Sequence, residues 1–474
     1  MKFKVSNGPF VKSSNSTSKM MTRLLIALIP IICLSILKNT IVVYFYTDAT
    51  LLESLHPIFM IILSIITSYV SELLYFKFIL KYKIADCIHE LSKSFSIIPG
   101  VLLSLVLPVS TPLWVIVFGA FFANIFGKMI YGGFGQNIFN PALIGYLFIS
   151  ASYSSLIGIH LNLYELDTLA GATPLTNLAS LNYVGSYDEI VSGYGSLLNF
   201  FVGSIPGSLG EVSKMLIIFA FVYLTITKTI KYLIPIFYVG TVFVITYVVS
   251  LFTDMGIWYP IFHILSGGLL FGAVFMATDP VTSPITKFGQ IFHGICLGVL
   301  TVSLRFLTSY PEGVMTSILF MNMFVPLCDK IGLCVKNNLK KVWIYILVIV
   351  IFISMTSYFI INKISYKEEN KISVNILETK KEGDKTIYNV SSKGWGLIKA
   401  TVTVENGEII SIDITDKSGE TQWSELEKND YVNKAIEYQD NIDSLDAVSG
   451  STFSSDGIKN IIKKILESEL SNEK

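Results

Sequence analysis

Two short strips of the sequence combine small side chains with a terminal threonine. The first reads Asp167-Thr168-Leu169-Ala170-Gly171-Ala172-Thr173, and the second reads Asp446-Ala447-Val448-Ser449-Gly450-Ser451-Thr452. A run of small residues lets the active site of a modifying enzyme close around the backbone, and the last threonine offers an unhindered hydroxyl. Such a hydroxyl can accept a phosphoryl group, because phosphoryl transfer requires positioning more than a special nucleophile. The simpler alternative is that each threonine caps a helix or begins a turn.

The composition indicates a membrane protein with a polar tail. Of 474 residues, 52% are hydrophobic and 15% are charged, whereas a soluble domain has about 25% charged residues. The residues after Asn362 hold 15 of the 35 Lys and Arg residues and 21 of the 35 acids. The 20 basic and 14 acidic residues before them give a net charge of +6, against −6 in the tail. An ordinary soluble enzyme is excluded, and no basic domain is available for nucleic acid.

Apolar runs long enough to cross a bilayer recur between Thr22 and Ile361. We expect about ten spans before Leu327, followed by one further span from Val342 to Ile361. The expected centres are Leu34, Ser64, Leu103, Phe121, Tyr146, Ala220, Thr241, Leu269, Leu297, Leu319 and Ile351. The fold class predicted is therefore a polytopic α-helical membrane protein.

The positions of the lysines in the loops predict the topology. The N-terminal segment is basic, and lysines follow the even-numbered spans, for example Lys77, Lys128 and Lys228. The long loop 159–213 contains no lysine. We therefore expect a multi-pass protein of a bacterial cytoplasmic membrane with a cytoplasmic N-terminus. The loop 159–213 and everything after the last span, and hence both threonine strips, should face outward.

The periodicity changes after the last span. Leu397 to Val404 and Ile409 to Ile414 alternate apolar and polar residues around Asn406-Gly407, which predicts a β-hairpin. Ile458 to Leu466 has helical spacing. We expect a membrane domain at residues 1–335, a further span and a linker at 336–372, and a small extracytoplasmic α+β domain at 373–474. The linker proper is the charged segment Lys363 to Lys371.

A weak internal repeat lies within the membrane region. Pro108-Val109-Ser110-Thr111-Pro112 is echoed by Pro280-Val281-Thr282-Ser283-Pro284. The first run lies between expected spans three and four, and the second lies between spans eight and nine. This placement is typical of two five-span halves of opposite topology with broken helices, whose backbone carbonyls can hold a cation or a polar cofactor. The alternative is two unrelated Pro-rich re-entrant turns.

A few polar residues lie within or beside the apolar runs. Four are candidates for an ion pathway, because ionisable groups are costly in a membrane, although such groups also cap helices: Asp279, Glu211, Arg305 and Glu312. Arg305 and Glu312 are expected to lie close together across a turn. His263 and His293 are expected to be packed, hydrogen-bonded residues rather than haem ligands. The five cysteines form no CxxC pair, so neither a metal centre nor a disulfide framework is expected.

The membrane region resembles the D subunit of the Rnf complex, the ion-translocating ferredoxin:NAD oxidoreductase. More distantly, it resembles the B subunit of the sodium-pumping NADH:quinone reductase. The resemblance covers roughly residues 8 to 330. The matching blocks are Tyr131 to Asn137, Phe139 to Ala142, Ala170 to Leu175, Pro206 to Glu211, Ser266 to Gly268, Phe275 to Pro284 and Tyr310 to Val314. The tail resembles the FMN-binding domain of the Rnf G subunit, through Gly394 to Gly396, the hairpin, Glu420-Thr421 and the second strip.

The two strips resemble the motif at which a flavin transferase attaches FMN to threonine through a phosphoester. The resemblance implies covalent FMN on both Thr173 and Thr452, each surrounded by the other residues of its strip. Two positions depart from the family pattern, since Ala170 stands where Ser or Thr is usual and Ser451 stands where Ala is usual. Both remain small. An additional noncovalent flavin is compatible with the resemblance, and three polar residues near the Gly-rich block either hold its ring or satisfy backbone groups: Gln136, Asn137 and Asn140.

The resemblance implies an electron-transfer subunit of a membrane complex that couples ferredoxin:NAD oxidoreduction to translocation of Na+ or H+. The sequence offers neither iron–sulfur ligands nor a nucleotide-binding Gly-rich loop, so partner subunits that bind iron–sulfur clusters, ferredoxin and NAD are required. No catalytic or metal-ligating residue is assigned. The alternatives are the B-type subunit of a sodium-pumping NADH:quinone reductase-like complex and a nonredox transporter with an outer sensor domain. A transporter would need neither threonine strip.

Overall fold

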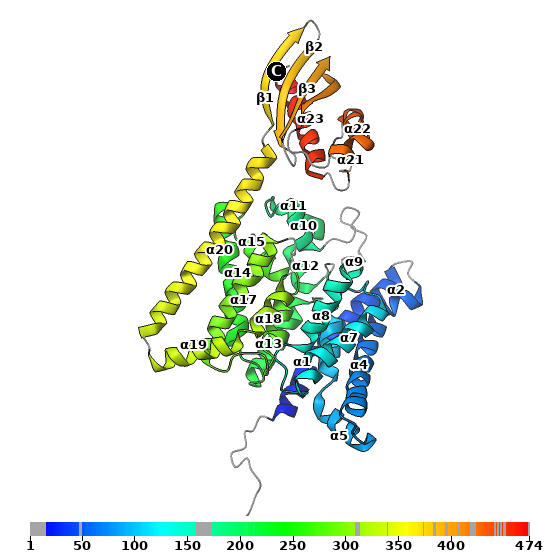
Figure 1. The fold of residues 1–474 in the computed structure, drawn as a ribbon, viewed down its shortest axis with the longest axis vertical. Helices are drawn as coiled ribbons and strands as arrows, with labels where there is room; N and C mark the ends of the chain where they lie inside the picture. The colour runs from blue at the N-terminus through cyan, green and yellow to red at the C-terminus, as the bar shows by residue number, and fades with distance from the viewer. Residues whose placement is uncertain are drawn as a thin grey trace, which may run out of the picture. The chain divides into compact units, whose positions relative to one another are not determined.

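The computed structural model describes residues 16–46, 50–157, 173–203, 205, 207–211, 213–308, 313–338, 340–372, 374–382, 385–393, 397–405, 407–417, 423–439, 442, 445, 448 and 452–472. The chain forms two compact units, residues 1–361 and 362–474. The first unit is helical, and the second contains a β-sheet with helices (Figure 1). The predicted class of a helical membrane protein with a small α+β domain is confirmed.

Every expected span centre lies in a helix of the first unit or in α20. These helices are α1 (Thr17–Ile36), α4 (His56–Leu74), α6 (Ile97–Val106), α7 (Leu113–Gly127), α8 (Pro141–Ser152), α13 (Lys214–Ile226), α14 (Leu233–Phe252), α16 (Leu269–Phe271), α17 (Lys287–Leu307), α18 (Val314–Asn322) and α20 (Lys340–Ile372). Two more, α15 (Trp258–Leu265) and α19 (Val325–Asn337), form bent pairs with α16 and α18.

The apolar helices of the first unit are not all long enough to cross a membrane. Among the described residues, six helices are long and apolar enough to cross a membrane, or eight if each bent pair is one span. The pair around α15 and α16 bends by 64°, and the pair of α18 and α19 bends by 66°. The apolar helices α6, α8 and α13 are shorter. Glycine and proline explain part of this difference, since Gly267 has a φ of +67° at one bend and Pro108 follows α6.

The two halves of the first unit pack their helices in corresponding ways. α4 lies against α6 and α7, and α7 lies against α8; likewise α14 lies against α15 and α17, and α17 lies against α18 and α19. The Pro-rich loops 107–112 and 277–286 precede α7 and α17, respectively. This correspondence supports the repeat, while the opposite topology of the two halves stays a prediction.

Short elements complete the first unit. The π-helical turn η1 (Leu37–Val42), α2 (Val43–Tyr46) and α3 (Leu51–Ser54) follow α1, and the π-helical turn η2 (Tyr75–Ile79) and α5 (Ile84–Ser94) follow α4. Between α8 and α13 lie α9 (Ser154–Ile157), α10 (Pro174–Ser180), α11 (Tyr187–Val191), η4 (Ser192–Tyr194), α12 (Leu197–Val202) and η5 (Leu209–Glu211). The π-helical turn η6 (Gly272–Met276) extends α16, and η3 (Met129–Tyr131) follows α7.

The sheet of the second unit is antiparallel and has the order β1-β2-β3-β4. Its strands are β1 (Asn375–Glu382), β2 (Lys385–Lys393), β3 (Leu397–Glu405) and β4 (Glu408–Asp416). Glu405 pairs with Glu408 across a two-residue connection in which Gly407 has a φ of +84°. The predicted hairpin is therefore confirmed, although Asn406 lies outside the described residues.

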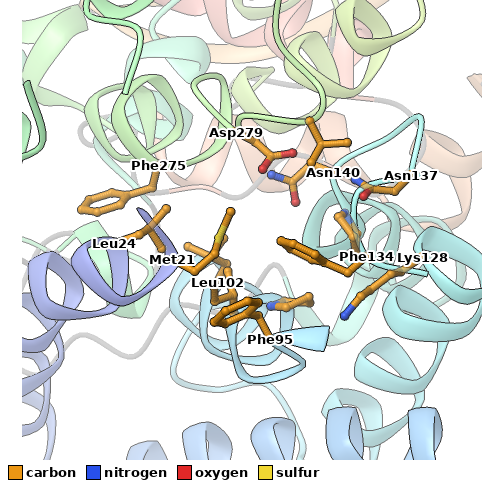
Figure 2. A pocket seen from close by; sticks show the side chains of 14 residues that line it. Met21, Leu24, Phe95, Leu102, Lys128, Phe134, Asn137, Asn140, Phe275 and Asp279 are labelled. Atoms are coloured by element: carbon orange, nitrogen blue, oxygen red, sulfur yellow. The ribbon is translucent and has the colours of Figure 1, made fainter. Parts of the chain in front are cut away.

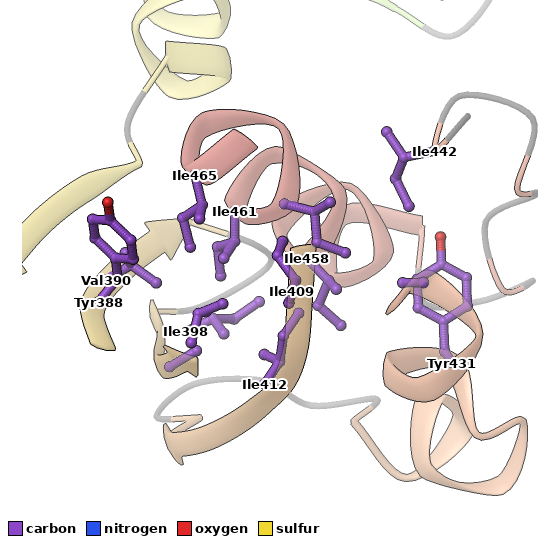
Figure 3. Close-up of a cluster of buried hydrophobic side chains, with 14 of the residues drawn as sticks. Tyr388, Val390, Ile398, Ile409, Ile412, Tyr431, Ile442, Ile458, Ile461 and Ile465 are labelled. Atoms are coloured by element: carbon purple, nitrogen blue, oxygen red, sulfur yellow. The ribbon is translucent and has the colours of Figure 1, made fainter. Parts of the chain in front are cut away.

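α23 (Thr452–Asn472) supplies much of the core of the second unit (Figure 3). Ile458, Ile461, Ile462 and Ile465 are fully buried at helical spacing and pack with sheet residues such as Ile398. The predicted helix is thus confirmed, and α21 (Trp423–Lys428) and α22 (Tyr431–Glu437) complete the unit. The segment expected as a charged linker is helical and continues α20 to residue 372, because its Lys and Glu residues are good helix formers. Its role as a linker stays a prediction.

Candidate functional site

Thr173, the first predicted attachment site, is the N-cap of α10. Its Oγ1 accepts a hydrogen bond from the amide of Thr176 at 3.2 Å and lies 2.8 Å from the Oγ1 of Thr176. Pro174 at the first helical position favours this helix start. The Thr173 residue is only 4% exposed. The other predicted residues of this site, Asp167, Gly171 and Ala172, lie outside the described residues.

α10 is fixed against the bend between α15 and α16. A β-carbon on Gly267, at the bend, would lie 2.8 Å from Cδ1 of Leu175 in α10. After α10, the Tyr183 hydroxyl donates to the carbonyl of Arg305 in α17. The Tyr259 hydroxyl of α15 donates to the carbonyl of Tyr183 at 3.0 Å. The predicted attachment site therefore begins a helix that is held on a broken span.

Two buried cations satisfy carbonyls that the broken span exposes. Arg305, which is 1% exposed, donates to the carbonyls of His263 at 2.7 Å and Ser266 at 3.4 Å. Lys214 donates to the carbonyl of Gly267 at 3.1 Å. Arg305 thus has a structural use at the bend. Its predicted neighbour Glu312 lies outside the described residues, so that contact stays a prediction.

Glu211, a predicted ion-pathway residue, lies beside the same bend. Its Oε1 would be 2.9 Å from a β-carbon on Gly268. The nearby Lys38 interacts electrostatically with Glu211 and donates to the carbonyls of Gly203 and Ile205 at 2.6 and 2.8 Å. The acid is therefore close to fixed positive charge, and its use in ion transport stays a prediction.

Asp279 lies in the second Pro-rich loop and helps to close it. Its Oδ2 accepts from the Thr282 hydroxyl at 2.9 Å, and its carbonyl accepts from the Ser283 hydroxyl at 2.6 Å. Lys231 donates to the carbonyl and hydroxyl oxygens of Ser283 at 2.9 and 2.8 Å. Asp329 of α19 accepts from the amide of Thr286, the N-cap of α17, at 2.8 Å. These contacts join the loop to α19 and to the segment between α13 and α14.

A pocket lies where this loop meets α1, the start of α6 and the Gly-rich loop before α8 (Figure 2). It has an empty volume of about 510 Å³, part of which is open to the exterior. Apolar groups dominate its lining, which includes Met21, Leu24, Phe95, Leu102, Phe134 and Phe275. Four polar side chains complete it, namely Lys128, Asn137, Asn140 and Asp279. A mainly apolar lining with a few polar groups is typical of a ligand site.

Asn137 and Asn140 each use one amide atom within the protein. Asn137 donates through Nδ2 to the carbonyl of Phe139 at 2.9 Å, and Asn140 Oδ1 accepts from the amide of Ala142 at 3.1 Å. In the described part of the chain, Asn137 Oδ1 and Asn140 Nδ2 have no hydrogen-bond partner. One acceptor and one donor therefore remain for a ligand. The third predicted residue, Gln136, is exposed and lies outside the lining of the pocket.

Sequence reasoning missed the buried ion pair behind this pocket. Lys128 was interpreted as a basic loop residue, but it is 2% exposed and its Nζ lies 2.6 Å from Oε1 of Glu72, which is 0% exposed. The signal that identifies such a pair is Glu72 itself, a lone acid in a long apolar run. A carboxylate in that position requires a partner.

The two membrane histidines are packed, as expected, but their rings are not hydrogen-bonded to any described residue. Both are 0% exposed, and neither ring nitrogen of either residue has a partner. His263 instead contacts the rings of Tyr259 and Phe306, with centroids 4.6 and 5.1 Å away. The prediction of hydrogen bonding is therefore wrong for these imidazoles within the described structure.

Thr452, the second predicted attachment site, is the first residue of α23. Its side chain and the residues Asp446, Ser449, Gly450 and Ser451 lie outside what the structure describes. One residue of the strip and the residue before the strip are held against α23. The amide of Val448 donates to Ser455 Oγ at 3.1 Å, and Lys459 donates to the carbonyl of Leu445. The strip therefore leads into a helix whose buried face packs on the sheet.

The comparisons with known families assign both parts of the chain. The profile of the NQR2, RnfD, RnfE family matches residues 4–337. The chain belongs to this family. The profile of the FMN-binding domain matches residues 394–467. Both resemblances drawn from the sequence blocks are thereby confirmed. Thr173 lies in the family region of this RnfD-type protein, and Thr452 lies in its FMN-binding domain.

Relatives support this assignment. The RnfD-type chain is 35% identical over 342 residues to the D subunit of the proton-translocating ferredoxin:NAD(+) oxidoreductase complex of Clostridium ljungdahlii. The matched region covers 72% of this chain and 97% of that subunit. It is 32% identical over 328 residues to the D subunit of the Na(+)-translocating ferredoxin:NAD(+) oxidoreductase complex of Acetobacterium woodii, covering 69% and 92%. The B subunit of the Na(+)-translocating NADH-quinone reductase of Chromohalobacter salexigens is 35% identical over 263 residues, but only 61% of its length is spanned.

Proposed function

We propose that this chain is an electron-transfer subunit of a membrane complex that couples ferredoxin:NAD oxidoreduction to translocation of Na+ or H+. Two relatives whose names carry this activity are matched over 97% and 92% of their lengths. The observation that carries the proposal is the joining of an RnfD-type membrane unit to an FMN-binding domain, each with one copy of the threonine strip. The alternative, the B subunit of an NADH:quinone reductase, is matched over a smaller share of the relative, 61%.

The proposal includes FMN bound covalently through phosphoesters to Thr173 and Thr452. Thr173 Oγ1 accepts the hydrogen bond from the Thr176 amide, so this contact can remain when the hydroxyl proton is replaced by a phosphoryl group. The contacts of Leu175 and Tyr183 hold the attachment point on the broken span. The flavin itself supplies one-electron exchange, and the protein tunes its potential through hydrogen bonds and charge.

The burial of Thr173 bears on when FMN is attached relative to the packing of α10. At 4% exposure, its hydroxyl is inaccessible to a flavin transferase while α10 is capped and packed. We therefore expect attachment to occur before α10 packs or while its N-terminus is open. A chain folded without flavin should accept FMN slowly at this position.

The groups that line the pocket of Figure 2 suit a noncovalent flavin. The rings of Phe95 and Phe134 provide aromatic surface, and the free Asn137 acceptor and Asn140 donor suit the adjacent N–H and C=O groups of the pyrimidine edge of a flavin. The apolar remainder of the lining would exclude water from the ring. We propose this pocket as the site of the additional flavin.

The remaining assignments follow from the sequence. We propose a bacterial cytoplasmic membrane location, a cytoplasmic N-terminus and an extracytoplasmic FMN-binding domain. The division into residues 1–335, 336–372 and 373–474 belongs to the same proposal. Partner subunits would supply the iron–sulfur, ferredoxin and NAD sites, and a flavin transferase would attach FMN.

The test is in-gel ultraviolet fluorescence of the denatured chain after coexpression with a flavin transferase, followed by mass spectrometry of peptides. Thr173→Ala and Thr452→Ala should each remove one FMN, and the double variant should be dark. Thr176→Ala and Ser451→Ala are matched controls that keep the attachment hydroxyls. A dark wild-type chain, or unmodified peptides from active complex, would refute covalent attachment.

A further inference from the structure

The buried carboxylate of Glu72 joins three segments around the pocket of Figure 2. Glu72 lies near the end of α4 and is 0% exposed. Its Oε1 accepts from Lys128 at 2.6 Å, and its Oε2 accepts from the hydroxyls of Ser96 at 2.6 Å and Ser94. Both carboxylate oxygens are therefore occupied within the protein. Such an arrangement is better suited to fixing structure than to binding a ligand directly.

The two serines flank a residue in a rare backbone conformation. Phe95, between them, has a φ of +52°, in the left-handed region. This conformation costs a side-chain-bearing residue energy and persists only where neighbouring contacts enforce it. Here one carboxylate oxygen accepts from the serines on both sides. The strained residue is thereby held with its ring in the lining of the pocket.

The same ion pair fixes the second ring of the pocket. Lys128 also donates to the carbonyl and hydroxyl oxygens of Ser94 at 2.6 and 2.8 Å, and its own carbonyl accepts from the amide of Gly133 at 3.2 Å. Its Nζ lies 5.7 Å from the ring centroid of Phe134. The rings of Phe95 and Phe134 lie 5.4 Å apart between centroids. We call these two rings the aromatic wall.

We propose that Glu72 is a positioning residue of this pocket: through Ser94, Ser96 and Lys128 it holds the aromatic wall in the geometry that receives a planar ligand. The inference rests on the proposal that the pocket holds a noncovalent flavin. It assigns Glu72 no direct contact with that ligand. It also explains why an ion pair, which is costly to bury, is placed directly behind two aromatic rings.

The test uses the full chain in lipid nanodiscs, stripped of noncovalent flavin, with riboflavin as the probe and quenching of its fluorescence as the readout. Ser94→Ala/Ser96→Ala should raise the dissociation constant about tenfold. Phe95→Leu should raise it to a similar extent. When the three substitutions are combined, the losses should not add, because the serines act through Phe95. Additive losses, or unchanged binding by the serine variant, would overturn the role of Glu72.

Two controls separate this role from general destabilisation. Ser92→Ala removes an exposed serine of α5 and should leave riboflavin binding unchanged. Glu72→Gln/Lys128→Met removes both charges together, so no unpaired charge stays buried, and it should still weaken riboflavin binding. In the ligand-free protein, this variant should also speed hydrogen exchange at the Gly133 amide; protection equal to wild type would contradict the proposal.

The failure of the inference and the failure of the proposed pocket give different results. If wild type binds no riboflavin, the pocket is not a flavin site and the role of Glu72 falls with it. If wild type binds riboflavin and the Asn137→Ala variant does not, the pocket is supported. In that case, normal binding by the Ser94→Ala/Ser96→Ala variant refutes the positioning role alone.

Discussion

Leu175 packs directly on Gly267, with its Cδ1 2.8 Å from the point that a β-carbon on Gly267 would occupy. This contact joins the helix that begins at Thr173 to the bend between α15 and α16. Glycine is required there for two separate reasons. Its φ of +67° is unfavourable for other residues, and the space beside it is filled by leucine.

Gly267→Ala should therefore destabilise the membrane unit by about 1–3 kcal/mol through backbone strain and crowding. We expect a lower midpoint of thermal unfolding in detergent and faster hydrogen exchange in α10. Gly240→Ala is the matched control, because a β-carbon on Gly240 in α14 would meet nothing within 4 Å. Equal effects of the two substitutions would show that the Leu175 contact does not hold α10.

Arg305 should be essential for the stability of the same bend. Arg305→Met leaves the buried carbonyls of His263 and Ser266 without their donor, at a cost of about 1.5–3 kcal/mol for each charged hydrogen bond lost. Arg305→Lys should recover part of the loss, since an ammonium group cannot reach both carbonyls with the fork of a guanidinium. The measurement is the thermal midpoint in detergent. Arg23→Met removes one half-buried hydrogen bond to the carbonyl of Thr227 and should lower the thermal midpoint less than Arg305→Met does.

The FMN-binding domain should show a local dependence on acid pH. A hydrogen bond from Lys417, at 2.7 Å, holds the pKa of Glu427 below its usual value of 4.5. Because the folded pKa is lowered, the stabilisation is present above the unfolded pKa and is lost as pH falls through the folded pKa. Hydrogen exchange in α21 should therefore accelerate below about pH 4.5 in wild type. Glu427→Gln should remove that dependence, and Glu425→Gln should not.

The sequence predicted those features that depend on local patterns. Apolar runs placed every span centre in a helix, and alternation around Asn406-Gly407 predicted the β3–β4 hairpin. Features that depend on long-range contacts were not predicted. The pairing of Glu72 with Lys128 joins residues 56 positions apart, and the lysine has the sequence context of an ordinary loop residue.

The candidate attachment residues depend on a local pattern as well. Thr173 and Thr452 can be proposed without knowledge of the fold because a strip of small residues is recognisable in the sequence, and their flavin attachment stays a prediction. The contact of α10 with the broken span was not predictable, because nothing near Leu175 in the sequence points to Gly267. Asn137 and Asn140, for which the sequence left a backbone-capping use and a flavin-holding use open, both line the pocket. The position of the Phe95 ring depends on a left-handed backbone conformation that no local pattern predicts.

The contact between α14 and α17 offers a test of close helix packing. A β-carbon on Gly298 would lie 2.6 Å from Cβ of Thr241, and the Tyr238 and Thr301 hydroxyls hydrogen-bond at 2.6 Å nearby. Gly298→Ala should separate the helices and cost about 1–3 kcal/mol. Adding Thr241→Gly should restore part of the lost stability, because it returns the missing space from the facing helix. If the double variant melts lower than Gly298→Ala alone, the two residues do not share the contact that limits the approach of these helices.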